Sequence, residues 1–190
     1  MRSRVGGLLE ETVKLELMKR LEAGSHALHA ELDGVDNALA VRVPRNGGWS
    51  ILQCIEHVAV SERDLLDRLR RAQCGNTAQP NPARESILLQ RAADRTQRIE
   101  APREAWPADR FMTPREALAG FDRARSETLH WLEQFTVDLR GWGTDHPLIP
   151  SPVNCYEILL LIAAHPERHA RQVREIRKDL ESETASGTRS

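Results

Sequence analysis

Two histidines, His165 and His169, stand four residues apart directly after an apolar run that covers residues 158–164. Residues four apart on an α-helix lie on one face, about 6 Å apart along its axis. Two imidazoles placed in this way can bind one metal ion together. This pair is the first candidate for chemistry in the sequence.

The two histidines also fall on the apolar face of the helix that would carry them. The positions on this face recur every three or four residues: Ile158, Ile162, His165, His169, Val173, Ile176 and Leu180. A polar group buried without a partner costs about 1–3 kcal/mol, so each ring needs one. A shared metal would serve both rings, whereas buried hydrogen-bond partners would serve each separately. The periodicity leaves both interpretations open.

Pro166 follows the first histidine of the pair and removes one backbone N–H from the helix. Its ring also crowds the carbonyl of Ile162, which predicts a bend or a widened turn. The bend is either a tolerated feature of a long helix, or it re-aims His165 and frees a carbonyl near the site. Because proline stands where an HExxH motif has glutamate, a zinc protease motif is absent.

A metal site needs a third protein ligand, and five other histidines could supply it. His26, His29 and His130 fall off the apolar stripes of their helices, and we expect them to be solvated. His146 lies in a loop and is expected near the surface. His57 remains, early in a helix but away from the centre of its apolar stripe. Periodicity alone does not place it opposite His165.

Four long helical patterns must position these residues, at about 8–35, 50–73, 113–135 and from 152 or 154 to 180. Ser50 with Gln53, and Thr113 with Glu116, are typical of capping boxes that begin the second and third helices. Gly24 lies on the apolar stripe of the first helix, which indicates a close helix contact or a kink.

The region between the second and third long helices is about forty residues, too long for a tight link. It contains a shorter helical pattern at about 84–99, and we expect it to cross over the bundle. The predicted fold class is therefore all-α: a four-helix bundle with a long middle crossover connection containing a short helix. One domain would cover residues 8–180, and the polar residues 181–190 would form a disordered tail.

Composition narrows the class of protein further. The chain has 190 residues, 40% of them hydrophobic, and a formal net charge of −1 with no basic stripe, so nucleic acid is not an expected partner. Three scattered cysteines, Cys54, Cys74 and Cys155, suit neither a disulfide framework nor a cysteine-rich metal site. The longest apolar run is far shorter than the roughly 20 residues of a membrane helix, and the first residues do not form a secretory signal. These features predict a cytoplasmic protein that is not inserted in a membrane.

Two segments resemble the DinB-like (DinB/YfiT) superfamily of metal-dependent four-helix bundles. The first is "GGWSILQCIEHVAVSE", in which a histidine follows eight residues after the tryptophan. The second is "LIAAHPERHARQVREI", which contains H-x-x-x-H-x-x-Q. The resemblance covers residues 8–180 and includes the long middle connection. Pro166 departs from the helix-forming residue that is usual in the family at that position.

The resemblance implies a metal triad of His57, His165 and His169. It also implies a divalent ion, Zn or Ni, with water completing the coordination shell, and a low-molecular-weight thiol as an additional cofactor. Such relatives include thiol-dependent transferases, and homodimers are common among them. The expected activity is thiol-dependent transfer or metal-dependent hydrolysis on a small-molecule substrate. The alternatives are a non-catalytic metal- or ligand-binding module and a metal-free helical interaction protein.

The sequence also predicts roles for three further side chains. Glu56, next to His57, would either support that histidine from behind or form a solvated surface carboxylate, the second being favoured. Cys54 and Cys155 are expected to be packing residues.

Overall fold

Four long helices form a bundle in the computed structural model, which describes residues 4–187 except 46, 78 and 98. They are α1 (Arg4–Leu32), α3 (Ile51–Arg70), α5 (Pro114–Gln134) and α6 (Cys155–Gly187). Around the bundle, α1 packs on α6, α6 on α3, α3 on α5 and α5 on α1. The predicted four-helix bundle is confirmed.

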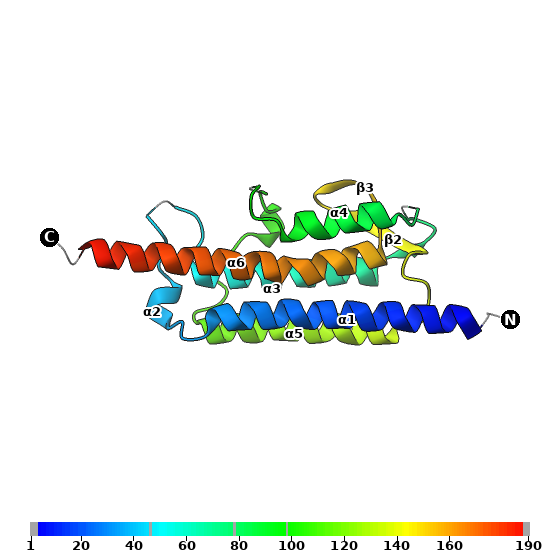
Figure 1. Ribbon diagram of the computed structural model, residues 1–190, viewed down its shortest axis with the longest axis horizontal. Coiled ribbons are helices and arrows are strands. Elements are labelled where there is room, and N and C mark those ends of the chain that lie inside the picture. The colour runs from blue at the N-terminus through cyan, green and yellow to red at the C-terminus, as the bar shows by residue number, and fades with distance from the viewer. Residues whose placement is uncertain (1–3, 46, 78, 98, 188–190) are drawn as a thin grey trace.

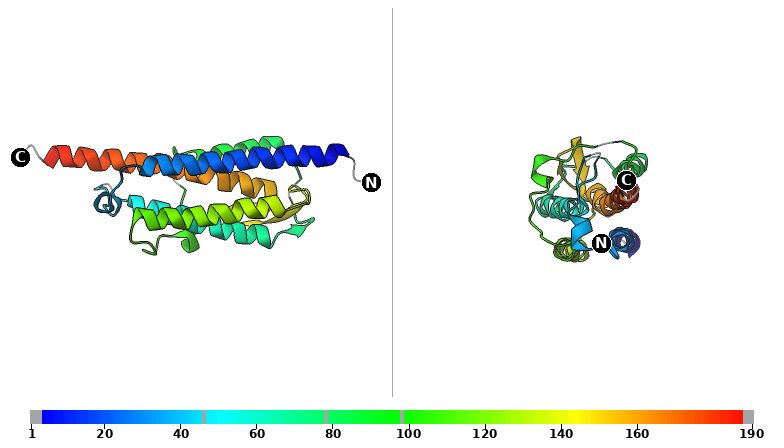
Figure 2. Two further views of the ribbon diagram at one scale, coloured as in Figure 1. Left: turned by 90° about the horizontal axis from the view of Figure 1, so that it is seen from below. Right: turned by 90° about the vertical axis from the view of Figure 1, so that its left-hand side faces the viewer.

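The order of the helices produces an unusual set of directions (Figures 1 and 2). α1 and α6 run the same way and lie side by side, and α3 and α5 form a second parallel pair. Parallel neighbours cannot be joined by a tight turn, so the chain must return along the bundle between α3 and α5. α3 and α6, which carry the histidines, are antiparallel.

The return segment is the predicted crossover. It contains α4 (Pro82–Ala93), which packs along α6, and a short 3-10 helix (Arg103–Ala105) that contacts α3. A four-residue helix, α2 (Asn37–Ala40), lies in the link between α1 and α3. The crossover thus covers the sides of α6 and α3 next to the histidines.

Side-chain caps begin the long helices where the sequence indicates. Ser50 and Gln53 form the reciprocal capping box that begins α3, and the Thr113 side chain accepts from the Glu116 N–H at the start of α5. At the start of α6 the Asn154 side chain accepts from the Glu157 N–H, and the Glu157 carboxylate accepts from the Asn154 N–H. The last pair selects Asn154 from the two predicted start positions.

A small antiparallel sheet, which the all-α prediction did not include, closes one end of the bundle. β2 (Trp142–His146) pairs with β3 (Ile149–Asn154) on one side and with β1 (Gln73–Cys74) on the other. The segment that forms the hairpin contains glycine and three prolines and lacks apolar alternation, so its sequence predicts an irregular link between two helices and not a pair of strands. At Gly143 a Cβ would lie 1.7 Å from the Asn76 carbonyl oxygen, so the approach of these two backbones requires glycine.

The last helix differs from its prediction. α6 continues to Gly187 instead of ending at Leu180, so the predicted disordered tail is helical over residues 181–187, and residues 188–190 lie outside those described. The Glu183 carboxylate accepts from the Arg45 N–H and ties this extension to the link before α3. None of the helices in the described part of the chain is long and apolar enough to cross a bilayer.

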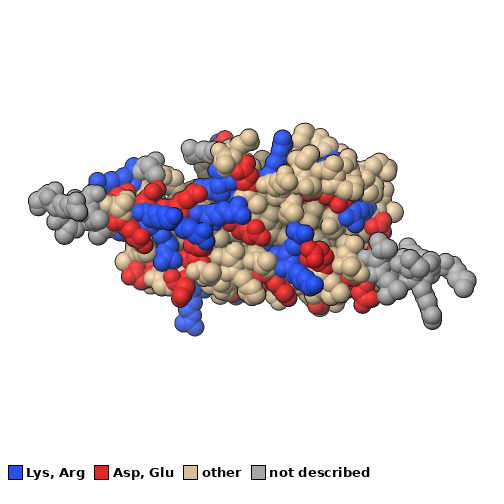
Figure 3. Space-filling view, in the orientation of Figure 1, with Lys and Arg blue, Asp and Glu red and all other residues tan. Residues whose placement is uncertain are grey.

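On the face shown in Figure 3, basic and acidic side chains lie next to one another over the left half and along the lower part, whereas the upper right is mostly free of charged side chains. Several form ion pairs between helices, such as Arg174 on α6 with Glu31 on α1. The apolar core runs along the axis of the bundle and contains the largest fully buried side chains, among them Phe121, Leu21, Ile55 and Ile162.

Candidate metal centre

The three histidines named from the sequence meet between α3 and α6. The Nε2 atom of His165 lies 3.2 Å from Nε2 of His57 and 3.0 Å from Nε2 of His169. All three ligand nitrogens lie within 4.8 Å of one another. Nitrogens bound to zinc at 2.0–2.1 Å are separated from one another by about 3–3.3 Å in tetrahedral or octahedral geometry. The side chains therefore fit one divalent ion.

The proton position on His57 follows from its other nitrogen. Nδ1 of His57 lies 2.7 Å from the carbonyl oxygen of Ala105, in the 3-10 helix of the crossover. A carbonyl oxygen only accepts, so Nδ1 must donate, and the lone pair of the neutral ring is on Nε2. Metal-binding histidines are commonly oriented by such a partner. The crossover thus prepares His57 as a ligand.

Glu56 holds the segment that follows Ala105. It is only 1% exposed, and its carboxylate accepts from the Ala108 N–H at 2.8 Å and the Arg110 N–H at 3.2 Å. The Arg110 guanidinium also pairs with it, at 2.6 Å. The favoured expectation of a solvated carboxylate is wrong because the crossover folds over this side of α3. Glu56 acts on His57 indirectly, by fixing the loop that carries its partner.

Burial keeps the imidazoles in the neutral form that metal binding requires. His57 and His169 are each 5% exposed, and His165 is half-buried. Burial lowers the pKa of all three rings, and for His165 and His169 the pKa falls well below the usual value because the neighbouring histidines add to the effect. Trp49, from the segment before α3, packs against the His57 ring at a centroid distance of 4.8 Å.

Pro166 does not break α6, which is helical throughout its described length. The carbonyl of Ile162, left without its helical donor, accepts a hydrogen bond from Nη2 of Arg125 at 3.4 Å. Arg125 lies on α5 and is 4% exposed. The carbonyl freed by Pro166 is thus satisfied from a neighbouring helix three residues before His165.

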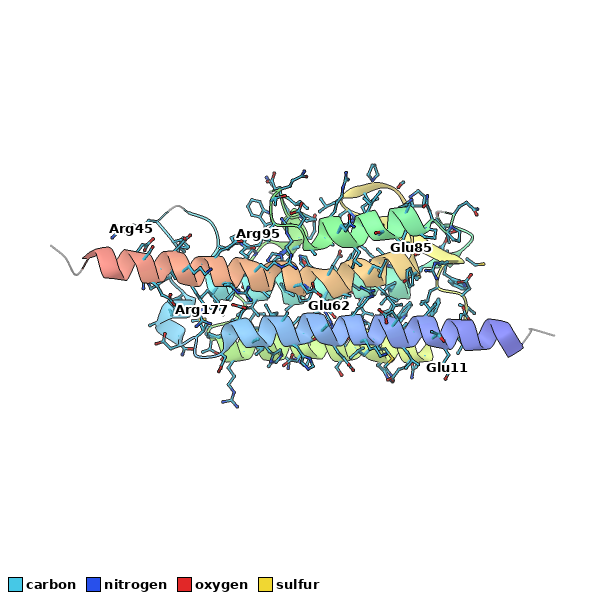
Figure 4. All side chains as sticks on the ribbon, viewed as in Figure 1. Glu11, Arg45, Glu62, Glu85, Arg95 and Arg177 are labelled. Atoms are coloured by element: carbon cyan, nitrogen blue, oxygen red, sulfur yellow. The ribbon has the colours of Figure 1, made fainter. Side chains whose placement is uncertain are left out.

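A pocket of about 990 Å³ opens beside the three histidines. Its walls come from α3, α4, α6, the crossover and the β2–β3 hairpin, and include Arg95, Arg168 and His146. Arg168 is 6% exposed, and burial, with the nearby charge of Arg95, lowers its pKa. Figure 4 places Arg95 just beyond the end of α4, beside α6.

The remaining histidines lie apart from the triad. His26, His29 and His130 are exposed, as predicted. His146 was expected near the surface but is half-buried in the pocket wall, where burial and the charge of Arg68 lower its pKa to about 4. His57, His165 and His169 form the only such metal-competent cluster among the described residues.

Two of the three free cysteines are packing residues, as expected. Cys54 and Cys155 are fully buried, and burial raises the pKa of each thiol to about 12. Both thiols are therefore protonated near neutral pH and are poor nucleophiles. The exposed third cysteine, Cys74, does not line the pocket beside the histidines. None of the three cysteines is thus placed to act at this site.

Comparison with known families identifies the family to which this chain belongs. The profile of the DinB superfamily matches residues 20–173, a span that contains His57, His165 and His169. The chain belongs to the DinB superfamily. Among curated protein sequences, none matches this DinB protein.

Two solved structures resemble this DinB protein over most of its length. TT2238, described as a four-helix bundle protein, is 26% identical, and the similarity covers 85% of this chain and 98% of that one with a TM-score of 0.55. YfiT from Bacillus subtilis, described as "a probable metal-dependent hydrolase with an unusual four-helix bundle topology", is 17% identical, with coverage of 88% and 87% and a TM-score of 0.54. The second likeness shows the fold alone.

Proposed function

We propose that this DinB protein binds one divalent metal ion, Zn or Ni, through His57, His165 and His169, and uses it to act on a small molecule. The observation that carries the proposal is the convergence of three Nε2 atoms at the edge of a pocket, with the tautomer of His57 set by Ala105. The description of YfiT as "a probable metal-dependent hydrolase" supports the same class of activity.

The short distances between the imidazoles favour a shared cation. Nε2 of His57 has no proton to donate, so only His165 can donate between the pair of rings 3.2 Å apart. One proton on Nε2 of His165 could serve both His57 and His169 only as a divided, weaker hydrogen bond. A metal ion would satisfy all three lone pairs at once, which is why we prefer it to the metal-free interpretation.

A divalent ion held by three imidazoles, with positions left open, acts as a Lewis acid and lowers the pKa of a bound water or thiol. The protein's own residues prepare the site for this chemistry. Ala105 orients His57, and Trp49 packs against its ring. We infer hydrolysis or thiol transfer on a small-molecule substrate, with any thiol supplied in solution, because Cys54 and Cys155 are buried and Cys74 does not line the pocket.

Metal content tests the proposal directly. Untagged protein incubated with Zn²⁺ or Ni²⁺ and then desalted should contain about one equivalent by elemental analysis, and His165→Ala should reduce this below about a tenth of an equivalent, because two ligands bind far more weakly than three. His146→Ala is the matched control, since it removes a nearby histidine of the same pocket and should leave the stoichiometry unchanged. Wild-type protein that retains less than a tenth of an equivalent after incubation would sink the metal proposal.

Activity separates an enzyme from a binding module. The metal-loaded protein would be screened for ester hydrolysis and for transfer of small thiols, with His165→Ala in parallel. Equal rates for the two proteins would remove the enzymatic part of the proposal and leave the module. The homodimer and the cytoplasmic location stay predictions of the sequence.

A further inference from the structure

Arg168, one residue before the ligand His169, is a buried cation without a carboxylate partner among the described residues. Arg168 is only 6% exposed, and its Nη2 donates to the carbonyl of Gln97 at 2.9 Å. Nη1 is buried and has no hydrogen-bond partner among the residues that the structure describes. Other buried or half-buried arginines in this fold face carboxylates: Arg125 pairs with Glu62, and Arg140 with Glu85. The difference indicates that the partner of Arg168 comes from outside the chain.

A second unused donor lies on the same pocket wall. Arg95 donates from Nη2 to the Glu175 carboxylate at 2.6 Å and from Nη1 to Gln172 at 3.3 Å, but its buried Nε has no partner within the described ranges. A buried donor left unpaired costs about 1–3 kcal/mol, and more when it is charged. Arg95 and Arg168 line the pocket that contains the three histidines. Two unpaired guanidinium donors on one pocket wall are what an anion-binding subsite requires.

The charges around the pocket set the charge of the anion. Arg95 is already neutralised by Glu175, and Arg68 by Asp64 and Asp145. Asp94 lines the same wall, where its carboxylate accepts from the N–H and hydroxyl of Thr96 and acts on the charge of Arg168 without an ion-pair contact. Glu100 and Glu104 line the pocket as well. These carboxylates would repel a second negative charge, so a monoanion is favoured over a dianion.

The rest of the pocket suits an apolar body. Ile99, Trp106 and Leu148 line it and are each about half exposed, at 49%, 46% and 49%. Large apolar side chains left accessible around a cavity commonly mark the place where an apolar ligand packs. Leu161 lines the same pocket from α6.

We propose that the substrate of this site is a small apolar molecule with a single carboxylate, which is seated on Arg168 and Nε of Arg95 beside the histidine centre. The inference rests on the proposed function for its reaction, but the binding of the anion does not require the metal. Arg168 is a binding residue that fixes the orientation of the substrate, and the apolar rim holds the remainder.

Calorimetric titration of the full-length protein with benzoate tests this inference, with benzamide as the neutral isostere and phenyl phosphate as the dianionic probe. A charge-assisted hydrogen bond is worth about 1.5–3 kcal/mol, so benzoate should bind about tenfold or more tightly than benzamide, and Arg168→Gln should weaken benzoate by a similar factor. Arg91→Gln is the matched control, because Arg91 lines the same pocket but is exposed. It should change benzoate affinity less than about twofold, as expected for a solvated charge. Phenyl phosphate should bind more weakly than benzoate.

The titrations are run with zinc-loaded protein and with metal-free protein. Equal affinities of wild type for benzoate and benzamide would overturn the inference, and this comparison needs no variant to fold. Tighter binding of phenyl phosphate would overturn the assignment of a monoanion. If benzoate bound only to the zinc-loaded protein, and Arg168→Gln did not change its affinity, the carboxylate would sit on the metal. That result would contradict the inference and leave the proposed function standing. If the protein took up no zinc but still bound benzoate through Arg168, the proposed metal function would fail and the anion-binding inference would stand.

Discussion

Two buried polar clusters lie between the helices of this bundle, and they are built on opposite principles. In one, Arg125 on α5 donates from Nε and Nη2 to the Glu62 carboxylate on α3, at 2.7 and 2.9 Å. Thr128 donates to the same carboxylate at 3.0 Å. The remaining donors of Arg125 reach the carbonyls of Leu21 on α1 and Ile162 on α6. Every partner belongs to the chain, and four helices are joined.

The histidine cluster and the arginines next to it are not satisfied by the chain. Three imidazole nitrogens point at one another, while Nδ1 of His169, Nη1 of Arg168 and Nε of Arg95 have no hydrogen-bond partner in the described part of the chain. Buried polar groups in native proteins are nearly all paired, and exceptions often mark functional sites. The first cluster joins the helices of the bundle, and we propose that the second binds groups that the chain does not provide.

The largest expected effect is on stability when the satisfied cluster is broken. Glu62→Gln leaves the Arg125 charge buried without its counter-ion, which should lower the free energy of unfolding by about 3–5 kcal/mol. Urea denaturation of metal-free protein measures this change.

His169→Gln should affect metal binding and not stability. We expect zinc affinity to fall at least a hundredfold, while the unfolding free energy of the metal-free protein stays within about 1 kcal/mol of the wild-type value.

Glu127→Gln is the matched control for the ion pair. Glu127 on α5 pairs with Arg70 on α3 at 3.0 Å, so it joins the same two helices, but both side chains are about half exposed. Its loss should cost less than about 1 kcal/mol. If Glu62→Gln were no more destabilising than Glu127→Gln, the buried cluster would not have the structural role that separates it from the histidine centre.

A smaller effect is expected where α1 and α6 approach each other beside the satisfied cluster. A Cβ at Gly24 would lie 2.5 Å from the carbonyl oxygen of Ala163, so Gly24→Ala must push the two helices apart. Helix propensity alone predicts that this change stabilises α1 by about 1 kcal/mol, whereas overpacking costs about 1–3 kcal/mol. We expect net destabilisation by about 1–2 kcal/mol in urea denaturation. A stabilised variant would show that Arg125 does not need this helix spacing to reach Leu21 and Ile162.

Local signals were sufficient to predict most of the fold. Caps at Ser50 and Thr113, apolar stripes at helical spacing and the length of the middle connection led to a four-helix bundle with a crossover, and the close contact at Gly24 is confirmed. The β2–β3 hairpin was missed because its strands pair across a segment with proline and glycine, and such pairing depends on tertiary context. The extension of α6 past Leu180 depends partly on Glu183 reaching Arg45, far away in sequence.

The site was predictable only in part. The spacing of His165 and His169 places them together because both lie on one helix, but the meeting with His57 depends on how α3 packs against α6, and only the resemblance to a family indicated it. Glu56 could have been recognised as buried only by knowing that the crossover folds over it. The sequence gives no sign that Arg168 is buried, because an arginine between His165 and His169 looks like any other charged residue of a helix.

The smallest expected effect is a difference in acid sensitivity between the two regions. His146 in the pocket wall has a pKa of about 4 in the folded protein, lowered by burial and then by Arg68, against about 6.5 when unfolded. Between these values the unfolded chain binds more protons, so the free energy of unfolding should fall as the pH drops below 6.5, by up to about 1.4 kcal/mol per pH unit for this group. His146→Gln should remove that share of the slope, whereas Glu127→Gln should leave it unchanged. Urea denaturation of metal-free protein at pH 7 and pH 5.5 measures both slopes. Identical slopes for wild type and His146→Gln would mean that His146 is solvated, and the pocket wall would then be more open than the structure describes.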